Sequence, residues 1–206
     1  MNIFISANNT GQGKTYSTLK LIETFSEMGY KVGVMKPIET GVEDLPQDGK
    51  LLLEKAREFN PEMNSVTLND VVPIQHKLPA APYVSGEVDF DLIEKSYNKI
   101  KPLCDILLIE GAGGILVPVN EKFYMINFLK YFNAKLFLVI GSRLGMINDF
   151  LLNLYYLNSQ KLSYTFAINL FDEEEYFKIT HPFMKRFNPL FIQKDLDKIA
   201  KNLLGE

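Results

Sequence analysis

The chain has 206 residues and a mass of 23.6 kDa, which fits one domain that buries its core without disulfides or structural metals. Its 22 Lys and Arg residues against 25 Asp and Glu residues give a net charge of −3, which excludes a general attraction for nucleic acid or anionic membranes. The single cysteine, Cys104, excludes an intrachain disulfide. No signal peptide and no apolar stretch of transmembrane length is visible, so we expect a cytoplasmic protein that binds neither membrane nor nucleic acid.

Short apolar runs alternate with longer helical patterns along the chain. Strands are predicted at residues 2–6, 31–36, 105–110, 135–140, 164–169 and 190–192. Helices are predicted at residues 14–28, 49–59, 90–100, 123–132, 146–158, 173–186 and 196–204. The segment 60–88 contains four prolines and predicts a loop excursion with one short strand.

Continuous apolar strands that alternate with helices indicate a mainly parallel sheet covered on both faces. We therefore expect a single domain over residues 1–206 with a three-layer α/β/α sandwich fold. In such sheets, ligands bind beyond the carboxyl ends of the strands. The segments expected at that edge are 7–15, 36–41, 110–114, 141–148 and Asn169.

The first predicted strand runs directly into the segment ANNTGQGKT at residues 7–15, and a helix follows. This is the P-loop pattern with Ala7 in place of its first glycine, and it predicts a P-loop NTPase type of domain. Glycines let backbone N–H groups surround phosphate oxygens, and the following helix directs its positive end at them. Lys14 would bridge the β- and γ-phosphates, and the Thr15 hydroxyl would bind Mg²⁺. The alternative is an ordinary glycine-rich turn between a strand and a helix.

A P-loop needs a carboxylate to complete the Mg²⁺ shell. Glu110 ends a buried strand and precedes a glycine-rich run that lets a ligand approach the backbone; the alternative is a glycine turn whose glutamate faces solvent. Asp48 is a second candidate ligand, and it is equally well explained as a helix N-cap. Lys36 lies at a carboxyl strand end, where a functional lysine and a solvated edge lysine are both reasonable.

Taken together, the P-loop, KPIETG at residues 36–41, IEGAGG at 109–114 and LGMIN at 144–148 resemble dethiobiotin synthetases over roughly the first 170 residues. The resemblance implies a ligase that closes the ureido ring of dethiobiotin from 7,8-diaminononanoate and CO₂ (or bicarbonate), with ATP as co-substrate and Mg²⁺ as cofactor. One amine captures CO₂ as a carbamate, the γ-phosphoryl group is transferred to it, and the second amine then attacks the mixed anhydride.

The resemblance also implies roles for individual residues. The implied catalytic residues are Lys14, Lys36 and Thr10, and the implied metal ligands are Thr15, Asp48 and Glu110. The implied nucleotide-binding residues are Gly11, Gln12, Gly13, Lys14, Thr15, Tyr16, Glu110, Gly111, Ala112, Gly113 and Asn169. The implied substrate-binding residues are Lys36, Thr40, Gly145, Met146, Ile147 and Asn148, the last four contributed by the partner subunit of a homodimer.

The chain departs from the family pattern at three places. Ala7 stands where the family usually has Gly, and Asn9 where it has Asp. Leu170 follows Asn169 where the family usually has Asp, and the tail is short, so selectivity between ATP and GTP or CTP stays open. The alternative functions are a partitioning-type nucleotide switch, whose P-loop carries an early lysine where this chain has Asn9, a nucleotide sensor and a small-molecule kinase.

Overall fold

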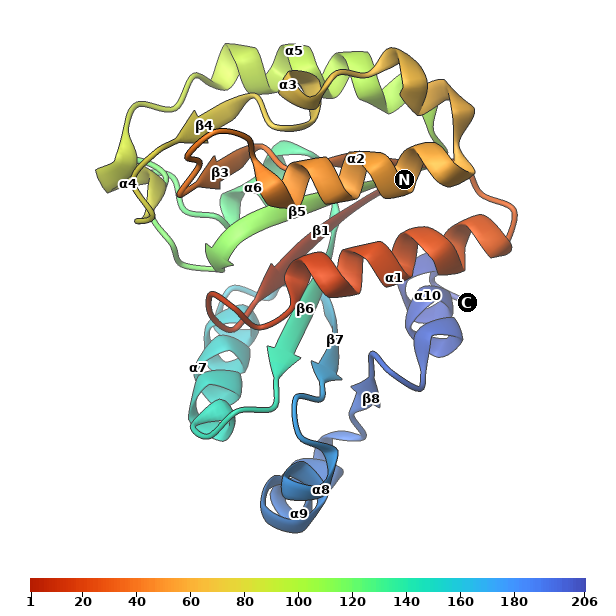
Figure 1. Ribbon diagram of the computed structural model, residues 1–206. Helices are drawn as coiled ribbons and strands as arrows, with labels where there is room; N and C mark the ends of the chain where they lie inside the picture. Colours follow the sequence, from red (N-terminus) through yellow and green to blue (C-terminus); the bar gives the residue numbers. More distant parts are fainter.

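A six-stranded parallel sheet forms the centre of the protein, described over residues 1–206 by a computed structural model (Figure 1). The strand order is β2-β5-β1-β6-β7-β8, and every pair is parallel. The strands are β1 (Asn2–Ala7), β2 (Val32–Met35), β5 (Ile106–Gly114), β6 (Lys135–Gly141), β7 (Tyr164–Asn169) and β8 (Leu190–Phe191). All six predicted strands are present, because each contains a short run of mainly apolar residues that the covered sheet can bury.

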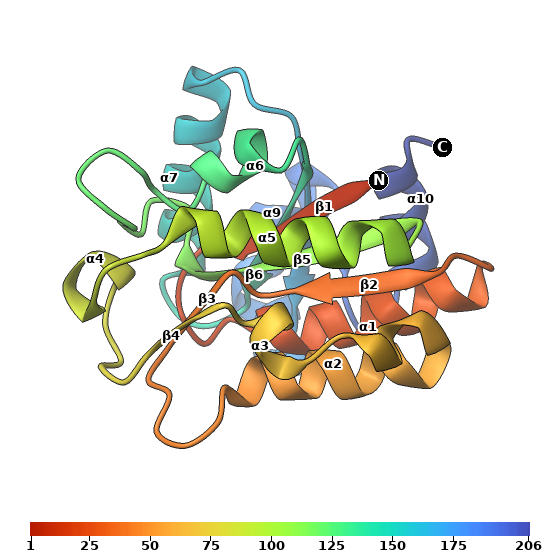
Figure 2. The ribbon, with the colours of Figure 1, turned by 90° about the horizontal axis from the view of Figure 1, so that it is seen from above.

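Helices cover both faces of this sheet, which confirms the predicted three-layer fold (Figures 1 and 2). One face carries α1 (Lys14–Glu27), α2 (Gln47–Phe59) and α10 (Leu196–Leu204), and the other carries α5 (Phe90–Ile100), α6 (Asn127–Tyr131) and α7 (Met146–Ser159). The Phe128 ring on α6 lies 6.2 Å from the Phe4 ring on β1 and from the Phe90 ring on α5. Aromatic packing of this kind joins the helical layer to the central strand. No helix combines the length and the low polarity that a membrane span requires.

The proline-rich excursion has more regular structure than the sequence predicted. Its short strand β4 (Ile74–His76) is present and pairs in parallel with β3 (Ile38–Thr40), a strand that follows Pro37 and was not predicted. It also contains the short helical segments η1 (Pro61–Ser65), α3 (Leu68–Val71) and α4 (Pro82–Ser85). A capping box between Thr67 and Asp70 begins α3, a signal that the sequence carried.

Two predicted helices were wrong in extent. The helix predicted at 123–132 is reduced to α6, because the side chain of Asn120 accepts hydrogen bonds from the N–H groups of Lys122 and Phe123 and forms a turn there. The helix predicted at 173–186 is divided into α8 (Glu173–Glu175), a π-helical turn η3 (Tyr176–Thr180), α9 (His181–Met184) and a 3₁₀ turn η4 (Lys185–Phe187). Pro182 has no N–H to continue the regular ladder, which accounts for the change of pattern. A further 3₁₀ turn, η2 (Lys101–Leu103), precedes β5.

Candidate active site

The phosphate loop joins β1 to α1 at the carboxyl edge of the sheet, where the arrowheads of β1 and β5 point in Figure 1. Gly13 adopts a left-handed conformation with φ of 92° immediately before α1. A Cβ atom at Gly13 would lie 2.1 Å from Nδ2 of Asn169, so both the backbone angle and the close approach require glycine here. Ala7, in contrast, is not among the residues with positive φ, so alanine fits at the first position of the loop.

A buried cluster of charges lies beneath this loop. Nζ of Lys36 is 2.6 Å from Oε1 of Glu110 and 3.0 Å from Oδ2 of Asp48. The hydroxyl groups of Thr15 and Thr18, both on α1, donate to the two oxygens of Glu110 at 3.0 and 2.9 Å. The side chains of Lys36 and Glu110 are 4% and 0% exposed, so neither solvated alternative holds in this structure.

Burial and neighbouring charges shift the pKa values in this cluster in different directions. Desolvation lowers the pKa of Lys14 to about 8, although Glu110 acts in the opposite direction. Desolvation also disfavours the charge on Lys36, but Glu110 and Asp48 outweigh it and hold the pKa of Lys36 above its usual value. Burial would raise the pKa of Asp48, but the Lys36 ammonium outweighs it and lowers that pKa. Lys36 is therefore a permanent cation, whereas Lys14 gains most from an anionic neighbour.

The first turn of α2 is held by a residue to which the sequence analysis gave no role. The carboxylate of Glu39 accepts hydrogen bonds from the backbone N–H groups of Asp48 at 3.1 Å and of Gly49 at 3.0 Å. Burial raises the pKa of Glu39. Of the two interpretations of Asp48, the helix N-cap was wrong: Pro46 occupies the N-cap position of α2, and the Asp48 side chain contacts Lys36 instead. Glu39 thus anchors the helix end that presents Asp48 to the site.

The loop and the charge cluster open onto one pocket of about 860 Å³. One end is bordered by Thr40 and the segment 79–82, and the other by Asn169, Phe171 and Gln193. The predicted site residues that line it are Thr10, Gly11, Gly13, Lys14, Thr15, Tyr16, Lys36, Thr40, Asp48, Ala112, Gly113 and Asn169.

Other predicted residues lie outside the pocket lining. Glu110 is buried beneath it and acts through its contacts, and Gly111 packs against Phe4. The side chain of Gln12 turns back to the carbonyl of Thr10 at 3.1 Å. The segment 145–148, at the start of α7, does not line the pocket of its own chain.

Four further parts of the site had no predicted role: Thr18, Glu39, the segment 79–82 and Gln193. Glu39 lies in the segment 36–41 that was expected at this edge of the sheet. Thr18 follows Lys14 by four residues, about one helical turn, so its position on the same face of α1 could have been predicted from the sequence. The segment 79–82 reaches the site through the excursion and Gln193 through the turn after β8, and no local pattern indicates either contact.

Comparisons with known proteins match the chain to one family model and to named enzymes. The AAA_26 family model, described as an AAA domain, matches residues 1–178. The chain is 38% identical over 98% of its length to the ATP-dependent dethiobiotin synthetase BioD of Sulfurovum sp., of which it covers 99%. It is 36% identical to the protein of that name from Wolinella succinogenes, with 98% of each chain covered.

Among solved structures, the likeness extends to the fold alone. The MinC:MinD cell division protein complex of Aquifex aeolicus gives a TM-score of 0.57 at 16% identity, with 100% of this chain and 96% of that chain covered. A plasmid partition protein of Borrelia burgdorferi gives a TM-score of 0.57 at 13% identity, with 99% and 97% covered. These structures share the parallel sheet and its helices, whereas full-length sequence similarity links the chain to the enzymes. The chain belongs to the family of ATP-dependent dethiobiotin synthetases.

Proposed function

We propose that this chain closes the ureido ring of dethiobiotin from 7,8-diaminononanoate and CO₂, with ATP converted to ADP and phosphate. Family membership supports an ATP-dependent ligase. The observation that carries the proposal is the convergence of two lysines, Lys14 and Lys36, at the floor of one pocket. Two cations placed together suit a reaction in which an anionic carbamate receives a phosphoryl group.

The residues of the chain account for the reaction without a protein nucleophile. One amine of the substrate takes up CO₂ as a carbamate, whose charge Lys36 and Lys14 stabilise. The γ-phosphoryl group passes to the carbamate oxygen, and ADP leaves. The second amine then attacks the carbamate carbon, forms the second C–N bond and releases phosphate. Phosphoryl transfer depends on positioning and positive charge, which the two lysines supply, and Thr10 and Thr40 are assigned to the carbamate or the diamine.

The nucleotide phosphates are assigned to the P-loop, whose residues 11–16 lead into α1, and to the glycine-rich end of β5. Thr15, Asp48 and Glu110 fit a Mg²⁺ ion, because all three offer the oxygen atoms that Mg²⁺ prefers. The structure contains no group of three or more His, Cys, Asp or Glu side chains that could hold a metal ion by themselves. A Mg²⁺ ion that is bound together with a nucleotide does not require such a group, because it needs only one or two protein carboxylates. When bound, Mg²⁺ would neutralise charge on the transferring phosphoryl group.

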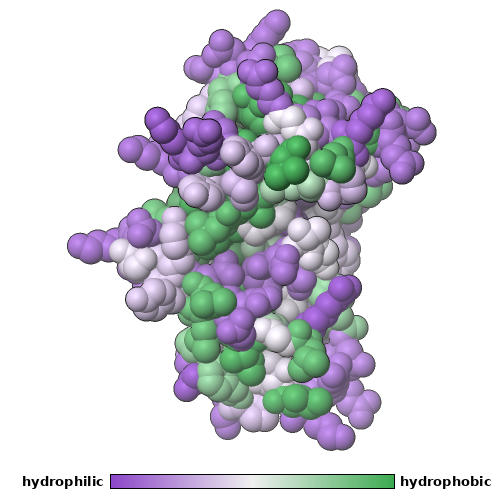
Figure 3. Space-filling model, turned by 90° about the vertical axis from the view of Figure 1, so that its left-hand side faces the viewer, coloured by the Kyte–Doolittle hydropathy of each residue, from purple (hydrophilic) through white to green (hydrophobic).

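The working unit is a homodimer in this proposal. The surface of α7 and the residue before its N-cap expose a run of large apolar side chains: Leu144, Leu151, Leu152 and Tyr155, exposed by 99%, 38%, 61% and 79%. Hydrophobic side chains are visible on the lower half of Figure 3, where α7 reaches the surface. A second copy would cover them. It would also bring its own Gly145–Asn148 helix start, with free N–H groups, to the carboxylate at the remote end of the diamine.

The function is tested by measuring dethiobiotin and phosphate together, with ATP, Mg²⁺, 7,8-diaminononanoate and bicarbonate each omitted in turn. We expect equal amounts of both products, and no more than background when any component is missing. Phosphate release without bicarbonate, into a phosphorylated diamine, would show a small-molecule kinase. Phosphate release at the same rate with and without the diamine would show a nucleotide switch.

Lys36 is predicted to act on the reaction rather than on nucleotide binding. Lys36→Ala should leave ADP affinity within a few-fold and lower turnover at least about 100-fold, because preorganised charge is lost from the transition state. The variant also leaves Glu110 buried without its cation, so folding is checked by circular dichroism and thermal unfolding. Lys20→Ala, which removes an exposed lysine paired with Glu23 on α1, is the control. Normal turnover in Lys36→Ala would remove this lysine from the mechanism.

Glu39 is predicted to act on the Mg²⁺ requirement through Asp48. Glu39→Ala frees the start of α2 and should raise the Mg²⁺ concentration for half-maximal activity, in the same direction as Asp48→Asn. Glu39→Gln keeps an acceptor for one of the two N–H groups and should raise this Mg²⁺ concentration less than Glu39→Ala does. The control is Asp89→Ala at the N-cap of α5, which is expected to lose stability by about 1 kcal/mol without changing the Mg²⁺ requirement. If Glu39→Ala changes stability alone, the residue serves only as a helix cap.

The homodimer predicts a light-scattering mass of about twice 23.6 kDa at micromolar protein concentration. Leu152→Asp places a charge on the exposed face of α7 and should give monomers that bind nucleotide but do not turn over the diamine. Ile179→Asp, at an apolar side chain of 60% exposure outside α7, should leave the dimer intact. A fully active monomer would contradict the shared site.

A further inference from the structure

Two side-chain amides connect the phosphate loop to the end of the sheet. Asn169, the last residue of β7, donates from Nδ2 to the carbonyl oxygen of Gln12 at 3.0 Å, and its Oδ1 accepts from Nε2 of Gln193 at 2.7 Å. Gln193 follows β8 and is itself held by the backbone of Leu170. Its Oε1 accepts from that N–H at 3.2 Å, and its Nε2 also donates to that carbonyl at 3.2 Å.

The orientation of both amides follows from these backbone partners. The oxygen and nitrogen of an amide side chain are assigned from their hydrogen-bond partners. The carbonyl of Gln12 can only accept, so Asn169 must present Nδ2 to it. The N–H of Leu170 can only donate, so Gln193 must present Oε1 to it, which leaves Nε2 facing Asn169. A flip of Asn169 would place two acceptors together at the loop and two donors together at Gln193.

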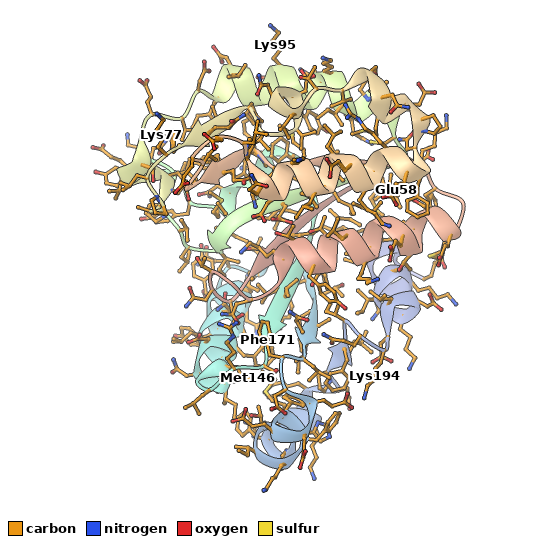
Figure 4. All side chains as sticks on the ribbon, in the orientation of Figure 1. Glu58, Lys77, Lys95, Met146, Phe171 and Lys194 are labelled. Carbon is orange, nitrogen blue, oxygen red and sulfur yellow. The ribbon has the colours of Figure 1, made fainter.

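A fixed amide distinguishes purine bases. Adenine presents a 6-amino donor beside the N7 acceptor, whereas guanine presents two acceptors, O6 and N7. In its fixed orientation Asn169 retains one free lone pair on Oδ1 and one free hydrogen on Nδ2, which complement adenine. Guanine would place O6 against Oδ1, acceptor against acceptor. Asn169, Gln193 and Phe171 all line the pocket, and Figure 4 labels Phe171 on one side of β7 and Lys194, the neighbour of Gln193, on the other.

We propose that Gln193 is a positioning residue that sets the selectivity of the nucleotide site, because, together with the carbonyl of Gln12, it holds Asn169 in the orientation that accepts a 6-aminopurine and rejects guanine. This inference rests on the proposed nucleotide site. It assigns the control of base selectivity to Gln193, which follows β8, because Leu170 has no side-chain carboxylate with which to exert it.

The test is the binding of ADP and GDP to the full chain by isothermal titration calorimetry. The wild type should bind ADP at least about tenfold more tightly than GDP. Gln193→Met keeps the length of the side chain and removes the amide, so the ratio of the two affinities should fall about tenfold. Gln193→Glu keeps the acceptor for Leu170 and loses the donor for Asn169, and should lower the ratio in the same way.

Gln75→Met is the matched control. Nε2 of Gln75 donates to Oδ1 of Asn69 at 3.1 Å and to the carbonyl of Val72 at 2.9 Å, the same kind of contact outside the pocket. This variant should leave the ratio unchanged. An unchanged ratio in both Gln193 variants, an equal loss of both affinities, or a wild type without preference for ADP would each overturn the inference. A wild type that prefers ADP but makes no dethiobiotin would overturn the proposed function alone.

Discussion

The ion pair between Lys36 and Glu110 is the interaction around which this site is organised. The two side chains are almost completely withdrawn from water, with Nζ and Oε1 2.6 Å apart. Removing two charges from water costs several kcal/mol each, and only close geometry with further hydrogen bonds offsets that cost. Here Thr15, Thr18 and Asp48 supply the remaining contacts. The pair therefore ties the end of β2 to β5 and fixes the starts of α1 and α2 against both.

Much of the architecture could be predicted from the sequence, because the spacing of apolar residues that identifies a helix or strand also shows which of its faces is buried. The strand predicted at 105–110 contains four consecutive apolar residues at 106–109, and such a continuous run is typical of a parallel sheet covered on both faces. The phosphate loop could also be predicted from the sequence, because its conformation depends on a few glycines within one turn. The helix predicted at 123–132 was wrong because the turn at Asn120 depends on side-chain to backbone bonds, which periodicity does not register.

The candidate site was less predictable than the fold, because several of its contacts join segments far apart in the chain. Asp48 looked like a cap by local rules, yet Glu39, on a strand that no pattern indicated, holds the first turn of α2. Gln193 lies 24 residues after Asn169, beyond a stretch of irregular helix. Such contacts follow from tertiary structure, in which the sheet order brings the carboxyl ends of separate strands to one edge.

The burial of Lys36 with Glu110 also constrains how the chain can evolve. Loss of either partner alone leaves an uncompensated charge in the interior, at a cost of about 3–5 kcal/mol against a total stability of about 5–15 kcal/mol. A lineage cannot discard the two residues one at a time without passing through a weakened protein. Replacement by a well-packed apolar pair would need two coordinated substitutions. A descendant that no longer needed the reaction would therefore retain both residues for many generations, and their presence in a relative would attest to common ancestry more firmly than to retained activity.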